Sequence, residues 1–144
     1  MNLSVLSTLT GFNVTSPTEV IARGYNGSSQ ETAGSIIKTQ TVNSICSGIV
    51  IAIERNPLNP NWCVTIEVDS QHWVRYCNLI GASLYVGATV KEKDLIGYSS
   101  KNLLQFEYCT TNKSKFPVRV GSKQLYKSDP TPILFGQVKL SEVI

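Results

Sequence analysis

The chain has 144 residues, of which 42% are hydrophobic and 16% are charged, and its 13 basic and 10 acidic residues give a formal net charge of +3. This length predicts one domain, and the composition excludes a disordered chain. No apolar run approaches the ~18 residues of a membrane-spanning helix. The weak, dispersed charge argues against nucleic acid as a partner. We therefore expect one globular domain with no membrane span.

The first residues carry no basic segment ahead of an apolar run, and Ser and Thr interrupt their apolar positions. This pattern is not that of a secretory signal peptide. We therefore expect a chain that is made in the host cytoplasm and kept inside the producing cell. Its expected organisation is a polar N-terminal arm over residues 1–16, followed by a single β domain over residues 17–144.

Short β-branched runs separated by Gly, Pro, Asn and Ser dominate the chain, and no helical periodicity is sustained. Pro57 and Pro60 predict a loop over residues 56–61. In the next strand Val64 and Ile66 alternate with Thr65 and Glu67, which predicts one buried and one solvent-facing side. Strands are expected, in chain order, at residues 49–53, 62–68, 72–79, 83–86, 94–97, 103–109 and 118–120.

Two further expectations concern the hairpin formed by residues 62–68 and 72–79. Trp62 and Trp73 are expected to form a cross-strand pair. The four cysteines have no C-x-x-C spacing and fall in strand-like stretches, which predicts buried free thiols in a reducing cytosol. These cysteines are Cys46, Cys63, Cys77 and Cys109.

Five short motifs follow one another along the chain: Gly48-Ile49-Val50, Val64-Thr65-Ile66-Glu67-Val68, Tyr76-Cys77-Asn78-Leu79, Val86-Gly87 through Ile96-Gly97, and Leu103-Leu104-Gln105-Phe106-Glu107. Their order resembles the LytM-type domain of the M23 family of zinc metallopeptidases. In the family the motifs read G-x-V, V-x-I-x-H, Y-x-H-L, V-x-x-G-x-x-V-x-x-G-x-x-I-G and H-L-H-F-E. The resemblance implies a mostly β, single-domain antiparallel β-sheet fold of M23/LytM type, similar to a barrel-sandwich hybrid, with few or no helices.

The resemblance also implies where a zinc site would stand, and this chain departs from the pattern there. Family members bind one Zn²⁺ with the His and Asp of H-x-G-x-D and the second His of H-x-H. Alignment by Gly34 places Thr32 and Ile36 at the first two ligand positions, and Gln105 stands at the third. Leu103 and Asn78 replace the two accessory histidines. These five degenerate groove positions predict no metal, no cofactor and no catalysis.

Other chemistry finds little support in the residues. His72 is the single histidine of the chain, and its place beside a hairpin turn favours a surface or packing role. A metal site built from cysteines stays open as a minor alternative. The hairpin around Lys91 and Lys93 also resembles biotinyl and lipoyl carrier domains, but neither lysine has the flanking residues of a carrier, and solvated charges are favoured.

The expected function is therefore a non-catalytic M23-like structural or binding module. The resemblance favours a phage virion, where the chain would contact other tail or baseplate proteins of a hub. Two alternatives remain open at this point: a divergent metal-dependent peptidoglycan hydrolase, and a non-catalytic binder of the cell wall, with peptidoglycan as a further partner in either case.

Overall fold

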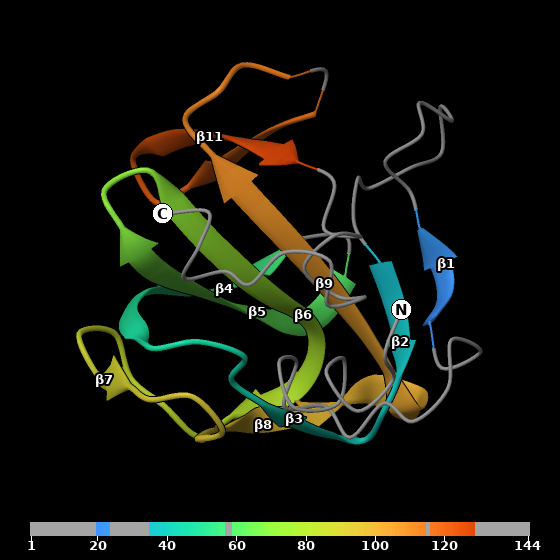
Figure 1. Cartoon of the computed structure of the whole chain (residues 1–144). Coiled ribbons are helices and arrows are strands. Elements are labelled where there is room, and N and C mark those ends of the chain that lie inside the picture. The colour runs from blue at the N-terminus through green and yellow to red at the C-terminus, as the bar shows by residue number, and fades with distance from the viewer. Residues whose placement is uncertain (1–19, 24–34, 57–58, 115, 129–144) are drawn as a thin grey trace, which may run out of the picture.

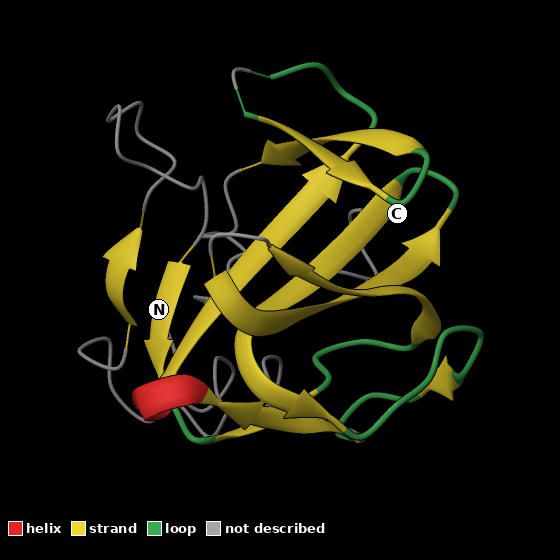
Figure 2. Ribbon diagram, turned by 180° about the vertical axis from the view of Figure 1, so that it is seen from behind, coloured by secondary structure: helices red, strands yellow, loops and turns green. Residues whose placement is uncertain are grey.

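The computed structural model describes residues 20–23, 35–56, 59–114 and 116–128, and in these the chain is almost entirely β (Figures 1 and 2). A single short 3-10 helix, η2 (Ser100–Asn102), links two strands of the described part. The strands are β1 (Val20–Arg23), β2 (Ser35–Lys38), β3 (Thr41–Asn43), β4 (Gly48–Asn56), β5 (Asn59–Asp69), β6 (His72–Ala82), β7 (Thr89–Val90), β8 (Leu95–Ser99), β9 (Leu103–Thr110), β10 (Pro117–Val120) and β11 (Lys123–Ser128). The predicted antiparallel β fold is confirmed. The expected arm over residues 1–16 lies outside the described residues.

The sheet is ordered β1-β2-β9-β6-β5-β4-β7, and neighbouring strands pair antiparallel. β9 holds the centre, with β6 along one edge. Along its other edge it pairs first with β2 and then with β11. β6 leaves β9 after Cys77 and continues beside β8, which in turn pairs with β3 (Figure 1). One long strand therefore connects two parts of the sheet.

Two strand predictions were wrong in detail. The loop predicted over residues 56–61 is shorter, because β4 runs to Asn56 and β5 begins at Asn59. Pro60 lies near the start of β5, where a proline is tolerated in a strand. Residues 83–86 form no strand; instead β6 extends to Ala82, and a turn leads into β7.

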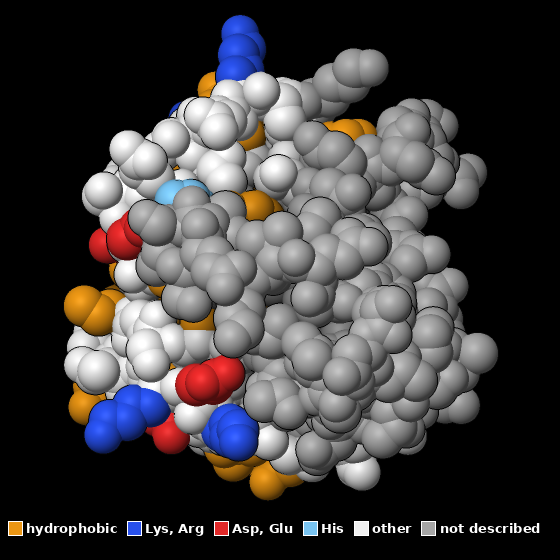
Figure 3. Space-filling view, viewed as in Figure 1, with side chains coloured by type: hydrophobic (Ala, Val, Ile, Leu, Met, Phe, Trp, Pro, Cys, Tyr) orange, Lys and Arg blue, Asp and Glu red, His pale blue; other side chains and the backbone are white. Residues whose placement is uncertain are grey.

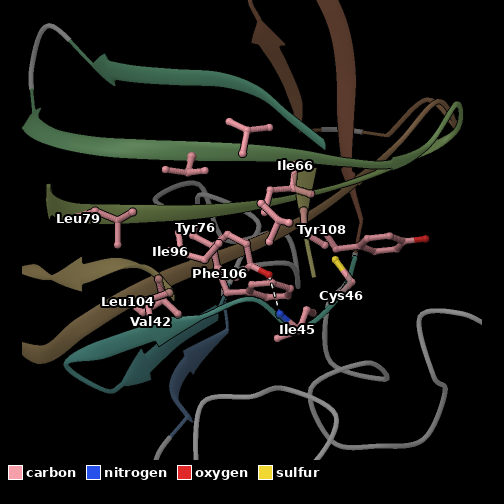
Figure 4. Close-up of a cluster of buried hydrophobic side chains, with 14 of the residues drawn as sticks. Val42, Ile45, Cys46, Ile66, Tyr76, Leu79, Ile96, Leu104, Phe106 and Tyr108 are labelled. Atoms are coloured by element: carbon pink, nitrogen blue, oxygen red, sulfur yellow. Dashed lines mark hydrogen bonds between the residues drawn. The ribbon is translucent and has the colours of Figure 1, made fainter. Parts of the chain in front are cut away.

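The larger hydrophobic core lies on one face of the β5-β6-β9 sheet and under β3 and β8. Its centre is Tyr76, which is fully buried, and whose ring lies 5.7 Å from that of Phe106. The Tyr76 hydroxyl accepts a hydrogen bond from the backbone N–H of Ile45 at 2.9 Å (Figure 4). Burial raises the pKa of Tyr76 well above its ordinary value. The buried phenol thus stays neutral and satisfies a backbone donor.

A second, smaller core lies on the opposite face, under the β10–β11 hairpin. It contains Trp73 and Cys109 from the sheet and Val120 and Leu125 from the hairpin. The prediction that the Thr65 side of β5 faces solvent was therefore wrong at Thr65, which is fully buried. The alternation within residues 62–69 could not predict this burial, because the β10–β11 hairpin that covers the face lies about fifty residues later in the chain.

The expected pairing of the two tryptophans was also wrong. Trp62 lies opposite Leu79 and Trp73 lies opposite Glu67, so the two tryptophans lie several residues apart along the β5–β6 hairpin. The guanidinium of Arg55 lies 4.6 Å from the Trp62 ring centre, whereas the Trp73 indole donates to Glu67 at 3.0 Å. The register shift between Trp62 and Val64 does not cause this separation: with Trp73 opposite Glu67, an unshifted register would place Trp62 opposite Asn78.

Two motif glycines have a packing reason. A Cβ at Gly48 would lie 2.5 Å from the carbonyl oxygen of Glu67, and one at Gly97 would overlap the carbonyl oxygen of Gly81. Both strands therefore approach their neighbours more closely than any side chain permits. The structure explains these glycines by strand contact and without reference to a ligand.

In the described part of the chain, no helix combines the length and the hydropathy needed to cross a membrane.

Candidate functional site

The structure brings four of the five degenerate positions to adjoining strands. Ile36 of β2 lies opposite Gln105 of β9, and Leu103 lies two residues before Gln105 on the same strand. Asn78 follows Cys77, which is the partner of Gln105 on the other side of β9. We call these four residues the candidate site. Thr32 lies outside the described residues.

Asn78 has a left-handed backbone with φ of 66°. Its side-chain amide donates to the backbone carbonyls of Leu103 at 2.7 Å and Ser100 at 3.2 Å, while its side-chain oxygen accepts from the amide of Asn61 at 2.8 Å. Asparagine is among the few residues that tolerate this conformation. Asn78 therefore fixes the point at which β6 leaves β9 and joins β8.

The side-chain amide of Gln105 is hydrogen-bonded to a buried cluster of charged side chains. It donates to the Glu107 carboxylate at 2.8 Å, and Lys127 of β11 binds the same carboxylate oxygen at 2.9 Å. The other oxygen of Glu107 forms an ion pair with Arg75 of β6. Glu107 is 1% exposed and Arg75 is 8% exposed, so the cluster lies in a region of low dielectric. Such a cluster is stable only when each charge has its partners.

Strand register places the members of this cluster in one row. Thr65 of β5, Arg75 of β6 and Glu107 of β9 are successive cross-strand partners, and Arg75 also donates to the Thr65 hydroxyl at 3.2 Å. The row links the candidate site to the smaller core, since Trp73 and Cys109 are the next side chains on the same face. Sequence analysis missed the cluster. Its only signal was the position of Arg75 and Glu107 among otherwise apolar strand residues.

The cysteines divide into two groups. Cys63 of β5 and Cys77 of β6 are joined in a disulfide, so the prediction of free thiols was wrong for this pair. It is confirmed for Cys46 and Cys109, which are buried free thiols. Desolvation by burial raises the pKa of each of these two thiols to about 12. Because Val64 pairs with Tyr76, Cys63 and Cys77 lie directly across β5 and β6 from each other, with Cα atoms 4.1 Å apart.

His72 lies at the far end of the β5–β6 hairpin from the candidate site. Its Nδ1 is 2.8 Å from the Asp69 carboxylate, and its ring stacks on Tyr108 with centroids 6.2 Å apart. Its β9 partner is Thr110, five residues beyond Gln105 and hence about 17 Å along the strand. The single histidine is therefore a turn and packing residue, and it is remote from the candidate site.

The zinc ion implied by the sequence resemblance does not fit the residues at these positions. A zinc ligand must be an imidazole, a carboxylate or a thiolate. Isoleucine and leucine have hydrocarbon side chains, and the amides of Asn78 and Gln105 are already hydrogen-bonded to protein groups. Among the residues that the structure describes, no group of three or more His, Cys, Asp or Glu could hold a metal. We derive no step through a metal at this site.

Among the described residues, acidic and basic side chains lie near one another at the surface. Figure 3 shows the described acidic and basic side chains interspersed on one face of the molecule. Lys123, for example, lies 3.7 Å from Glu67 and 5.5 Å from the Trp73 ring centre. The large apolar side chains exposed in the described part of the chain are those of Ile49, Ile80, Tyr85, Val86 and Tyr98.

Comparison with known proteins identifies the fold. No family model and no curated protein matches the chain. Solved structures do match: lysostaphin superposes with a TM-score of 0.61 and 20% identity over 79% of this chain and 49% of its own. Another structure of lysostaphin describes it as an antimicrobial peptidase from Staphylococcus simulans. The chain has the fold of M23/LytM-type peptidase domains.

Two other structures agree. LytU matches with a TM-score of 0.61 and 20% identity over 79% of this chain and 82% of its own. A chain of the SpoIIQ–SpoIIIAH pore-forming complex matches with a TM-score of 0.59 and 18% identity over 90% of this chain and 78% of its own. This chain spans about half the length of lysostaphin. At these identities the likeness establishes the M23/LytM-type fold alone.

Proposed function

We propose that this chain is a non-catalytic structural or binding module built on the M23/LytM-type fold. The observation that carries the proposal is the chemistry of the candidate site. The side-chain amide of Asn78 donates hydrogen bonds to two backbone carbonyls, and that of Gln105 donates to the Glu107 carboxylate. Both side chains therefore serve the fold, Gln105 at a zinc-ligand position of the family pattern and Asn78 at the position of an accessory histidine.

The composition of the chain supports the same reading. A zinc site of the M23 pattern needs two histidines and an aspartate, and the whole sequence has one histidine. That histidine, His72, is held by Asp69 at a distant turn. Cys63 and Cys77, the cysteines nearest Gln105, are joined to each other in a disulfide. Thiolates are therefore not free to replace the missing ligands while this disulfide is intact.

The setting that we propose is an assembly, with other tail or baseplate proteins of a phage virion as partners. A neighbour in fold that belongs to a pore-forming complex supports the idea that this architecture can serve in assemblies. The virion itself rests on the resemblance of the sequence. Detection of the chain by mass spectrometry in purified particles tests it, and a chain that purifies as a stable monomer and enters no particle contradicts it.

Purified peptidoglycan distinguishes binding from cleavage. The chain is mixed with insoluble cell walls in the presence of micromolar zinc, and both sedimentation of the protein and turbidity of the suspension are followed. An active M23 peptidase is the positive control for clearing. The proposal predicts that the suspension does not clear. Co-sedimentation is compatible with a binding role, and its absence is compatible with a role in assembly alone. Clearing that depends on added metal contradicts it.

The second candidate is a divergent peptidoglycan hydrolase, and it is favoured by fold neighbours that are described as peptidases. It requires a metal site assembled from residues other than the four of the candidate site. It predicts metal-dependent clearing in the same assay. The two candidates are therefore separated by one measurement.

A further inference from the structure

The Cys63–Cys77 disulfide joins β5 to β6 next to the candidate site. Cys77 of β6 is also the cross-strand partner of Gln105 on β9. The disulfide therefore lies directly beside the candidate site. Cys77 is 4% exposed, whereas Cys63 is half-buried. The Cys63 side is therefore the more exposed end of the disulfide.

The ladder is irregular at this point. The β5–β6 register shifts between Trp62 and Val64, and the β6–β8 register shifts between Leu79 and Gly81. A bulge leaves backbone groups outside the regular ladder and weakens local pairing. Besides strand pairing and core packing, side-chain links hold the region: the disulfide itself and the three hydrogen bonds of Asn78.

We propose that the Cys63–Cys77 disulfide is a redox-sensitive latch that fixes the conformation of the candidate site. A dithiol reductant delivers two electrons and two protons, the sulfur–sulfur bond breaks, and each cysteine gains a hydrogen while the reductant forms its own disulfide. The bulge then keeps the Asn78 hydrogen bonds but loses its covalent cross-link. The segment around Cys77 and Asn78 gains freedom, and the strand beside Gln105 opens more often.

The two remaining cysteines make the latch selective. Cys46 lies in the larger core and Cys109 in the smaller one, and burial raises the pKa of both thiols to about 12. At neutral pH they are protonated and shielded, so they neither exchange with the disulfide nor titrate with reagents in the folded chain. Redox chemistry in the described part of the protein is thereby confined to Cys63 and Cys77.

The first test counts thiols by alkylation with a maleimide in denaturant, followed by intact mass. The latch predicts two alkylated cysteines before reduction and four after reduction with a phosphine. Reduction also removes a cross-link between residues 14 apart, and we expect the melting temperature to fall by about 5–10 °C. Four alkylated cysteines in the untreated protein, or an unchanged melting temperature, overturn the proposal.

The second test localises the effect by amide hydrogen exchange of the full chain. The proposal predicts at least a tenfold faster exchange in residues 76–79 and 103–106 on reduction, with residues 49–53 of β4 unchanged. The C63A/C77A variant should exchange like the reduced protein and ignore the reductant, whereas C46A should keep the response. The unmodified chain with and without reductant gives the answer even if a variant does not fold. Uniform acceleration over all strands, or none, contradicts the latch.

The consequence for binding rests on the proposed function and has its own readout. Co-sedimentation with peptidoglycan is compared for oxidised and reduced protein. If the oxidised chain binds, weaker binding on reduction supports the latch and equal binding counts against it. If the oxidised chain does not bind, the wall-binding form of the proposed function fails, and thiol counting and hydrogen exchange decide the latch separately.

Discussion

Gln105 donates a hydrogen bond from its side-chain amide to the carboxylate of Glu107, 2.8 Å away on the same strand. The residue at a zinc-ligand position of the family pattern thus belongs to a buried charge cluster. Arg75 and Lys127 complete that cluster from β6 and β11. The cluster links the candidate site to the β10–β11 hairpin, and its disruption should lower the stability of the whole domain.

Replacing Glu107 by Gln tests the cluster. The variant keeps the shape of the side chain but leaves Arg75 and Lys127 buried without their shared anion. We expect the free energy of unfolding to fall by about 3–5 kcal/mol, the range for breaking a buried ion pair. Denaturant titration measures it. The matched control is Glu92→Gln at an exposed position, which should change stability by less than about 0.5 kcal/mol. Similar values for the two variants would refute a structural role for the cluster.

Asn78 should be sensitive both to loss of its amide and to its backbone conformation. Asn78→Ala removes the hydrogen bonds to Ser100 and Leu103. It also places alanine, whose side chain cannot form stabilising hydrogen bonds, at a φ of 66°. We expect a loss of about 2–4 kcal/mol. Asn78→Gly loses the same hydrogen bonds but accepts the conformation, so it should be about 1 kcal/mol more stable than the alanine variant. An alanine variant as stable as the glycine variant would rule out the conformational part of this account.

Gly97 and Gly81 offer a matched pair for the close approach of β6 and β8. A methyl group at Gly97 meets the carbonyl oxygen of Gly81, whereas one at Gly81 has open space around it. Gly97→Ala should therefore lower stability by about 2–3 kcal/mol through overpacking. Gly81→Ala should stay within about 0.5 kcal/mol of the native chain. Thermal melts of the two variants decide, and equal melting temperatures would show that the strands do not approach as described.

Asp69 links stability to pH at the β5–β6 turn. The backbone N–H of Gln71 donates to its carboxylate, and this hydrogen bond, followed by that of His72, holds the pKa of Asp69 below its ordinary value. The stabilisation is present above the ordinary pKa near 4 and is lost as the pH falls through the lowered pKa of the folded state. Asp69→Asn should thus melt below the native chain at pH 7, and the gap should shrink towards pH 3. A gap that widens on acidification has the wrong sign for this contact.

The β-branched runs and their alternation were enough to predict the β fold, the β5–β6 hairpin and β9. The order of Gly48, Tyr76, Gly97 and Phe106 was enough to indicate the M23/LytM-type fold, because these residues make close strand contacts or fill the larger core. Such positions tolerate few substitutes and keep their sequence pattern. β1 to β3 were missed, since each has only three or four residues.

The candidate site was predicted as a set of positions, and the structure places four of them on adjoining strands. Its surroundings could not be predicted. The disulfide depends on the β5–β6 register in which Val64 pairs with Tyr76, and the partners of Glu107 come from strands that are distant in sequence. Alternation within one strand says which residues share a face. It does not say which strand will cover that face or which cross-strand residues will meet.

The most direct test of the central claim is the zinc content of the purified chain. The protein is dialysed against micromolar zinc and then against buffer, and bound metal is measured by elemental mass spectrometry. Our account predicts less than about a tenth of an equivalent, because the candidate site offers no set of ligands that zinc requires. Close to one equivalent, retained by the folded chain, would contradict it and would place metal-dependent hydrolysis ahead of a binding role.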